Sequence, residues 1–210
     1  MKKIFVLLTT LALLTLTACI SKDAKGKLEE TTTPPSTVVV PETPVAPAVP
    51  VELITNGDFS ASTGWTINQS GDGDPWGGTG GKIEVAYNTG AAVVTIVKGD
   101  STVNYEAQFY QTAPLVIGKI YTVSFEYSAD TDSELVFSLE KEGGNPCYLS
   151  GSADDKKAFL TASTTTKTYS NTFTASETND AAKVVFLLSS APTNAKITID
   201  KVSLKEATTK

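Results

Sequence analysis

The stretches Asn56-Gly57-Asp58-Phe59 and Ile197-Thr198-Ile199-Asp200-Lys201-Val202-Ser203-Leu204 decide the fold of this chain. The first combines turn residues with an aromatic residue, and Gly64-Trp65 follows it closely. The second alternates apolar and polar residues, as a strand with one buried face does. Because they stand at the two ends of residues 51–207, we expect them to be the first and last strands of one β-sandwich.

The residues between these two stretches alternate with a period of two. Tyr121, Val123, Phe125 and Tyr127 are separated by polar residues, and similar alternation occupies residues 82–87, 135–140 and 168–173. Turn residues rich in glycine, proline and asparagine separate these segments at 71–75, 98–100, 143–146 and 191–194. Many short strands at this spacing predict an all-β, antiparallel sandwich or barrel. Since no internal repeat is present, we expect a single domain over residues 51–210.

Two segments depart from simple alternation. Residues 183–188 are apolar on both faces, which fits a strand buried between layers and equally a strand that lines a ligand groove. In the last strand the buried parity changes between Ile199 and Val202, with Asp200-Lys201 at the change. A β-bulge produces this shift and re-aims side chains, so Asp200 is either specially oriented or an ordinary surface carboxylate.

The first fifty residues have the composition of an export signal and a tether. Lys2 and Lys3 precede an apolar run over residues 4–16, and a small residue then precedes Cys19. This order predicts a bacterial lipoprotein signal peptide at 1–18, with Cys19 lipidated. Residues 19–50 are rich in proline and threonine, which favours an extended linker. We therefore expect an exported, membrane-anchored lipoprotein at the outer membrane or the cell surface.

Composition excludes several functional classes. The chain has a net charge of −6, and it contains no histidine and no arginine, which argues against nucleic-acid binding and against histidine-based catalysis. Once Cys19 carries lipid, Cys147 has no partner for an intrachain disulfide. The acidic side chains, Glu140 among them, alternate with apolar residues or stand in loops, and they indicate solvated faces. We expect no enzymatic activity.

The bracketing stretches and the β-rich interior resemble the carbohydrate-binding modules of families 4, 9 and 22, which are galactose-binding-like jelly rolls. The resemblance implies a groove for a polysaccharide or oligosaccharide in which aromatic rings stack on sugars. Matching positions imply sugar contacts at Tyr105, Gln108, Tyr148 and Lys183, and Gln111 is a further polar candidate close to Gln108. Leu187 stands where such modules often carry a polar residue. Trp76 lies in a glycine-rich loop and is a further candidate contact.

Strand parity leaves part of this assignment open. Tyr105 shares its parity with Ala107 and Phe109, which suits core packing as well as a groove rim. Gln108 and Tyr110 have the opposite parity and would then point outward.

The resemblance also implies a structural calcium ion where the first and last strands meet. Its ligands would be Asp58, the carbonyl of Gly81, and Asp200. Two alternatives stay open, since Asp58 can cap its own turn and Lys201 can take the place of the cation.

The expected function is therefore non-catalytic carbohydrate binding. The alternative is a surface adhesin or assembly lipoprotein that uses the same sandwich to bind a protein partner, because a fold does not fix a function.

Overall fold

The computed structural model describes residues 49–73, 77–88, 90–144, 147–149 and 157–207. All of them belong to one compact unit, Ala46–Lys210. The predicted signal peptide and linker, including Cys19, lie outside the described residues, as does Trp76. No helix in the described part of the chain is long and apolar enough to cross a membrane.

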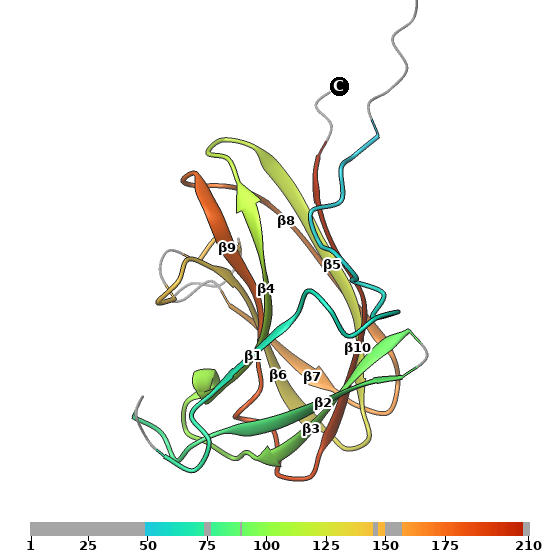
Figure 1. Ribbon diagram of the computed structural model, residues 1–210, viewed down its shortest axis with the longest axis vertical. Coiled ribbons are helices and arrows are strands. Elements are labelled where there is room, and N and C mark those ends of the chain that lie inside the picture. Colours follow the sequence, from blue (N-terminus) through green and yellow to red (C-terminus); the bar gives the residue numbers. More distant parts are fainter. Residues whose placement is uncertain (1–48, 74–76, 89, 145–146, 150–156, 208–210) are drawn as a thin grey trace, which may run out of the picture. The chain divides into compact units, whose positions relative to one another are not determined.

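The described strands form two antiparallel sheets (Figure 1). Sheet I has the order β1 (Thr66–Gln69), β4 (Ala107–Leu115), β9 (Asn179–Leu187), β6 (Ser133–Glu140) and β7 (Ala158–Ala162). Sheet II has the order β2 (Lys82–Asn88), β3 (Ala91–Lys98), β10 (Lys196–Glu206), β5 (Ile120–Ala129) and β8 (Lys167–Thr174). A short 3₁₀ helix, η1 (Asn104–Glu106), leads directly into β4. The predicted all-β jelly-roll sandwich is confirmed.

Aromatic side chains from both sheets meet in the core between them. Phe186 of β9 packs edge-on against Phe125 of β5, with ring centroids 4.9 Å apart. Trp65 stacks on Phe109 at 4.9 Å and is 9% exposed. This arrangement follows from the alternation in β5, where Tyr121, Val123, Phe125 and Tyr127 are all buried while the residues between them are half-buried.

The two stretches at the ends of the domain meet in space, as the sequence predicts. The amide of Val202 donates to the carbonyl of Gly57 at 2.9 Å, and the amide of Leu53 donates to the carbonyl of Leu204 at 2.9 Å. The pairing of β10 with β5 changes register between Asp200 and Ser203, which confirms the predicted bulge. Lys201 stands in that bulge with a φ of 52°, in the left-handed region.

One strand differs from its prediction. The alternation in residues 135–140 predicts that Glu140 is solvated, yet β6 is buried on both faces and Glu140 is only 6% exposed. The polar residues are accommodated because Ser138 Oγ donates to Glu140 Oε2 at 2.7 Å. A hydrogen bond between neighbouring polar residues removes much of the cost of burying them.

Candidate functional site

The outer face of sheet I, which points away from sheet II, carries side chains that strand register aligns in rows. Gln108 of β4 lies opposite Leu187 of β9, which lies opposite Val136 of β6. The next row contains Tyr110, Val185 and Ser138, and the third contains Thr112, Lys183 and Glu140. Alternate residues of the same strands, such as Phe109 and Phe186, enter the core.

An apolar strip runs across the middle of this outer face. Val136 and Val185 are fully buried and Leu187 is 1% exposed, and together they form a cluster separate from the main core. Tyr110 is half-buried and packs against them. Because these three side chains are covered within the protein, the accessible part of this face is the half-buried row of Gln108, Tyr110 and Lys183 beside them, which is the candidate binding surface.

Polar groups border the strip. The ammonium of Lys183 lies 4.7 Å from the ring centroid of Tyr110, which is a cation–π contact. Gln108 Nε2 donates to the carbonyl of Tyr105 at 2.9 Å, which fixes the amide so that Oε1 is left without a donor. The face thus combines an aromatic ring, a cation and an amide acceptor, which suit a ligand rich in hydroxyl groups and C–H patches.

Of the five predicted sugar contacts that lie in the described residues, the structure brings three together. Gln108 and Lys183 both lie on the outer face of sheet I, at either side of Tyr110 along the sheet. Tyr105 stands on η1 at the start of β4, and it is 36% exposed.

The other two predicted contacts lie elsewhere. Gln111 points to the core side of β4 and is 7% exposed, and its amide both accepts from and donates to the backbone of Thr55. Tyr148 is 4% exposed in the main core, where its hydroxyl accepts from Asn179 at 2.9 Å. Burial raises the pKa of Tyr148. Neither side chain offers a free surface in this arrangement, so we leave both out of the proposed contact set.

Tyr110 was not among the predicted sugar contacts. Its parity with Gln108 placed it on the outward side, and the doubly apolar segment 183–188 fitted a buried strand and a lined groove equally. Placing Tyr110 beside segment 183–188 requires knowledge that β4 pairs with β9, and a single sequence does not reveal this pairing. The register places Tyr110 directly opposite Val185.

The three expected calcium ligands are not brought together. The Asp58 side chain accepts from the amide and hydroxyl of Ser60, at 3.3 and 3.0 Å, which is ordinary turn capping. The Asp58 backbone approaches Gly90, just before β3 begins, whereas Gly81 lies just before the opposite end of β2. The seven residues of β2 span about 20 Å, so Gly81 cannot share an ion with a group near Gly90.

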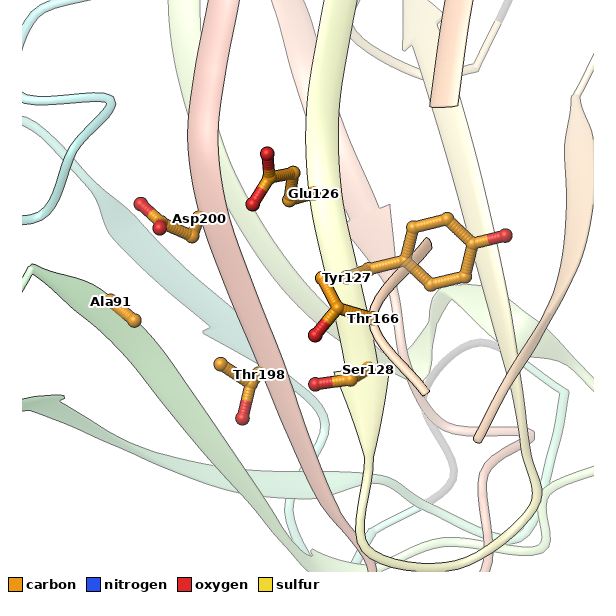
Figure 2. Close-up of a pocket in the computed structure, with 7 residues that line it drawn as sticks. All are labelled: Ala91, Glu126, Tyr127, Ser128, Thr166, Thr198 and Asp200. Atoms are coloured by element: carbon orange, nitrogen blue, oxygen red, sulfur yellow. The ribbon is translucent and has the colours of Figure 1, made fainter. Parts of the chain in front are cut away.

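Asp200 lies on the outer face of sheet II. It is paired with Glu126 of β5, and both border a pocket of about 110 Å³. Figure 2 shows the residues that line the pocket: Ala91, Glu126, Tyr127, Ser128, Thr166, Thr198 and Asp200. Lys201 donates to both oxygens of Glu126, at 2.9 and 3.0 Å, and so places a cation beside this carboxylate pair. Calcium at Asp58 and Asp200 stays a prediction; within the described residues no three His, Cys, Asp or Glu side chains form a metal-binding group.

Comparisons with known proteins agree with this architecture. A family model described as a carbohydrate binding domain matches residues 51–194. A solved family 4 carbohydrate-binding module (CBM4) is 24% identical with a TM-score of 0.59, and the match covers 73% of this chain and 99% of that module. The N-terminal cellulose-binding domain of Cellulomonas fimi β-1,4-glucanase C is 20% identical with a TM-score of 0.52, covering 76% of this chain and 100% of that domain. A search of curated proteins returned no match.

Proposed function

The chain belongs to the family of carbohydrate-binding domains, and we propose that it binds a polysaccharide or oligosaccharide, without transforming it, on the outer face of sheet I. The observation that carries this proposal is the row of half-buried side chains Gln108, Tyr110 and Lys183 beside the buried apolar strip of Val136, Val185 and Leu187. Gln108, Tyr110 and Lys183 are half-buried there and supply the contacts.

The contacts divide by chemistry. The rings of Tyr110 and Tyr105 offer flat faces for the C–H patches of pyranose rings, while Gln108 and Lys183 hydrogen-bond to hydroxyl groups. Each sugar hydroxyl exchanges bonds to water for bonds to protein, so the net gain per bond is about 1 kcal/mol and the affinity is modest. Because one structural neighbour is a cellulose-binding domain, β-1,4-linked glucan oligosaccharides are the first ligands to test.

The two carboxylates that β6 places on this face do not suit glycoside hydrolysis. Retaining and inverting glycosidases place two carboxyl groups about 5–9.5 Å apart across the scissile bond. Glu134 and Glu140 lie on the same face of β6 but six residues apart, which corresponds to about 20 Å. This separation supports binding without catalysis.

The sugar-contact assignment is tested with a Tyr110→Ala/Lys183→Ala double variant. We expect it to bind cello-oligosaccharides about 10-fold more weakly than the wild type, because it removes an aromatic face and a hydrogen-bond donor. Isothermal titration calorimetry measures the affinity, and circular dichroism establishes that the variant is folded. Glu84→Ala, an exposed substitution on β2 of sheet II, is the matched control and should bind normally.

Undiminished sugar binding by the double variant would refute the assignment to this face. If no polysaccharide on a broad glycan array binds the wild-type chain, the alternative of a protein partner becomes the better account.

We also propose that Cys19 carries the lipid that anchors the chain, at the outer membrane or cell surface. The basic start, the apolar run and the small residue before Cys19 support this proposal. In a Cys19→Ser variant we expect metabolic labelling with palmitate to disappear and the protein to leave the membrane fraction. Cys147→Ser is the control and should label like the wild type. Labelling of the Cys19→Ser variant at the wild-type level would contradict the proposal.

A further inference from the structure

Exposed apolar side chains gather at one end of the domain. Among the described residues nine large hydrophobic side chains are exposed, and five of them are Val49, Val51, Val116, Ile117 and Ile120. The last three belong to the turn that joins β4 to β5 and to the first residue of β5, and every residue of that turn is exposed. Single exposed apolar residues are ordinary, whereas a gathered patch marks a contact surface.

Both chain ends of the domain lie beside this turn. The amide of Ala207, just after β10, donates to the carbonyl of Ile120 at 2.7 Å. On the other side of β10, Glu52 forms an antiparallel bridge with Lys205. Since neighbouring strands are about 4.8 Å apart, Val51 lies about 10 Å from Ile120 across the end of sheet II. Figure 1 shows the first described residues and the end of β10 leaving the domain at the end that carries the β4–β5 turn.

Hydrogen bonds hold the turn in place. The amide of Gly118 donates to the carbonyl of Ala175 at 2.9 Å, and the amide of Ala175 donates to the carbonyl of Lys119 at 2.9 Å. The amide of Val116 donates to the hydroxyl of Tyr121 at 3.0 Å. These backbone groups are satisfied inside the protein, so the turn offers its apolar side chains to a partner.

Three carboxylates near this end are each paired with a lysine. An unpaired carboxylate resists transfer from water toward an apolar surface, and an ion pair reduces that cost. The charges of these groups cancel in pairs, so they oppose contact with an apolar partner less than free carboxylates would. The pairs are Glu206 with Lys119, Glu52 with Lys205, and Glu177 with Lys141.

We propose that this end of the domain rests on the surface of the lipid membrane, with Val116, Ile117 and Ile120 among the lipid headgroups. The part of the chain that precedes Val49 argues for this partner, because its apolar run and Cys19 predict a lipid anchor. The tether joins the domain at its apolar end, and a tether raises the local concentration of the two surfaces. A contact too weak to hold a free protein therefore forms in the anchored one.

The membrane contact leaves the sugar face free. Tyr110 lies five residues before Leu115, the last residue of β4, which corresponds to about 17 Å along the strand. The proposed sugar contacts therefore stand clear of the headgroups. The choice of a membrane as the partner rests on the proposed lipid at Cys19, whereas the apolar end and the sugar face are separate surfaces that variants can change one at a time.

The test uses the full lipidated chain, purified from the membrane fraction and reconstituted into vesicles of phosphatidylethanolamine and phosphatidylglycerol. Ile117→Cys in a Cys147→Ser background carries a fluorescent nitrobenzoxadiazole label, and nitroxide-labelled lipids quench a fluorophore at headgroup depth. We expect about a twofold loss of emission, because interfacial side chains lie about 5–10 Å into the headgroup region.

Phe159→Cys in the same background is the matched control. Phe159 is 55% exposed, and register places it in line with Val136, Leu187 and Gln108, seven residues from the end of β4 that carries the turn. We expect a label there to keep its emission. Equal quenching at positions 117 and 159 would overturn the proposal, as would no quenching at 117.

A second variant adds Val116→Ser and Ile120→Ser to the chain labelled at position 117. Both residues are exposed, so the substitutions change stability little and the variant should fold. We expect the quenching to disappear while the affinity for cello-oligosaccharides stays at the wild-type value. Quenching that survives both substitutions would contradict the proposal.

Failure of the lipid anchor has its own signature. Missing palmitate label and recovery of the chain from the soluble fraction would show that Cys19 carries no lipid. The labelled soluble chain is then added to the same vesicles. Quenching at position 117 would support the membrane contact without the anchor, and its absence would overturn the contact.

Discussion

Replacing Gly57 by alanine is expected to lower the free energy of unfolding by about 3 kcal/mol or more. The new Cβ atom would lie 1.9 Å from the carbonyl oxygen of Val202 and 2.9 Å from its carbonyl carbon. These are backbone atoms of β10, so no side chain can rotate away to relieve the contact. The φ angle of Gly57 lies outside the left-handed region, so steric overlap alone causes the loss.

The measurement is urea unfolding, with Gly118→Ala as the matched control. Gly118 has a φ of 78°, and nothing lies within 4 Å of the position of its Cβ. Alanine there carries only the conformational penalty, about 1–2 kcal/mol. A cost for Gly57→Ala no greater than that of Gly118→Ala would show that the first segment does not pack on β10 as described.

The contact at Gly57 is one of several that join the two ends of the domain. Besides the backbone hydrogen bonds at Gly57 and Leu53, the carboxylate of Glu52 accepts from the amide of Leu204 at 2.8 Å and from the hydroxyl of Ser203 at 2.6 Å. Direct contacts of this kind pin the first segment to the last strand. An ion at Asp58 and Asp200 would add to a junction that is already closed.

Alternation predicts the fold well where one face of a strand meets water. The bulge in β10 can be predicted from the sequence for the same reason, because a bulge changes the parity of the buried residues. The prediction fails in β6, because polar residues such as Glu140 and Ser138 indicate exposure only when nothing covers them. There the two side chains satisfy each other inside the protein.

The candidate site is less predictable than the fold. Which face of β4 carries each residue follows from parity, so Gln108 is placed correctly by alternation and Gln111 falls on the core side. The partner strand is not encoded in any short segment, and the pairing of Tyr110 with Val185 joins residues 75 positions apart in the sequence. Tyr148 follows a loop, where side-chain direction depends on tertiary contacts with Asn179 and Glu177.

Phe186→Ala is expected to cost about 3–5 kcal/mol of unfolding free energy. Phe186 is fully buried in the core. Its ring centroid lies 4.9 Å from that of Phe125, 5.2 Å from that of Phe137 and 6.0 Å from that of Trp65. The removed ring leaves a cavity lined by other rings on strands of both sheets. Those strands are held by their hydrogen-bond ladders, so the cavity cannot collapse fully and the lost contacts are not replaced.

Phe159→Ala is the control that separates burial from residue type. Phe159 lies on β7 of the same sheet and is 55% exposed, so its loss should cost about 1 kcal/mol or less. For a domain of this size, the Phe186 variant should unfold about 6–20 °C below the wild type. Comparable losses for the two variants would mean that the rings of β9 and β5 do not share one core.

Val185 and Leu187 flank Phe186 on the opposite face of β9. If the Phe186 variant still folds, its sugar affinity therefore shows whether the position of the apolar strip depends on the core beneath it. Retained sugar binding by the folded fraction would show that the backbone ladders between β4, β9 and β6 position the strip.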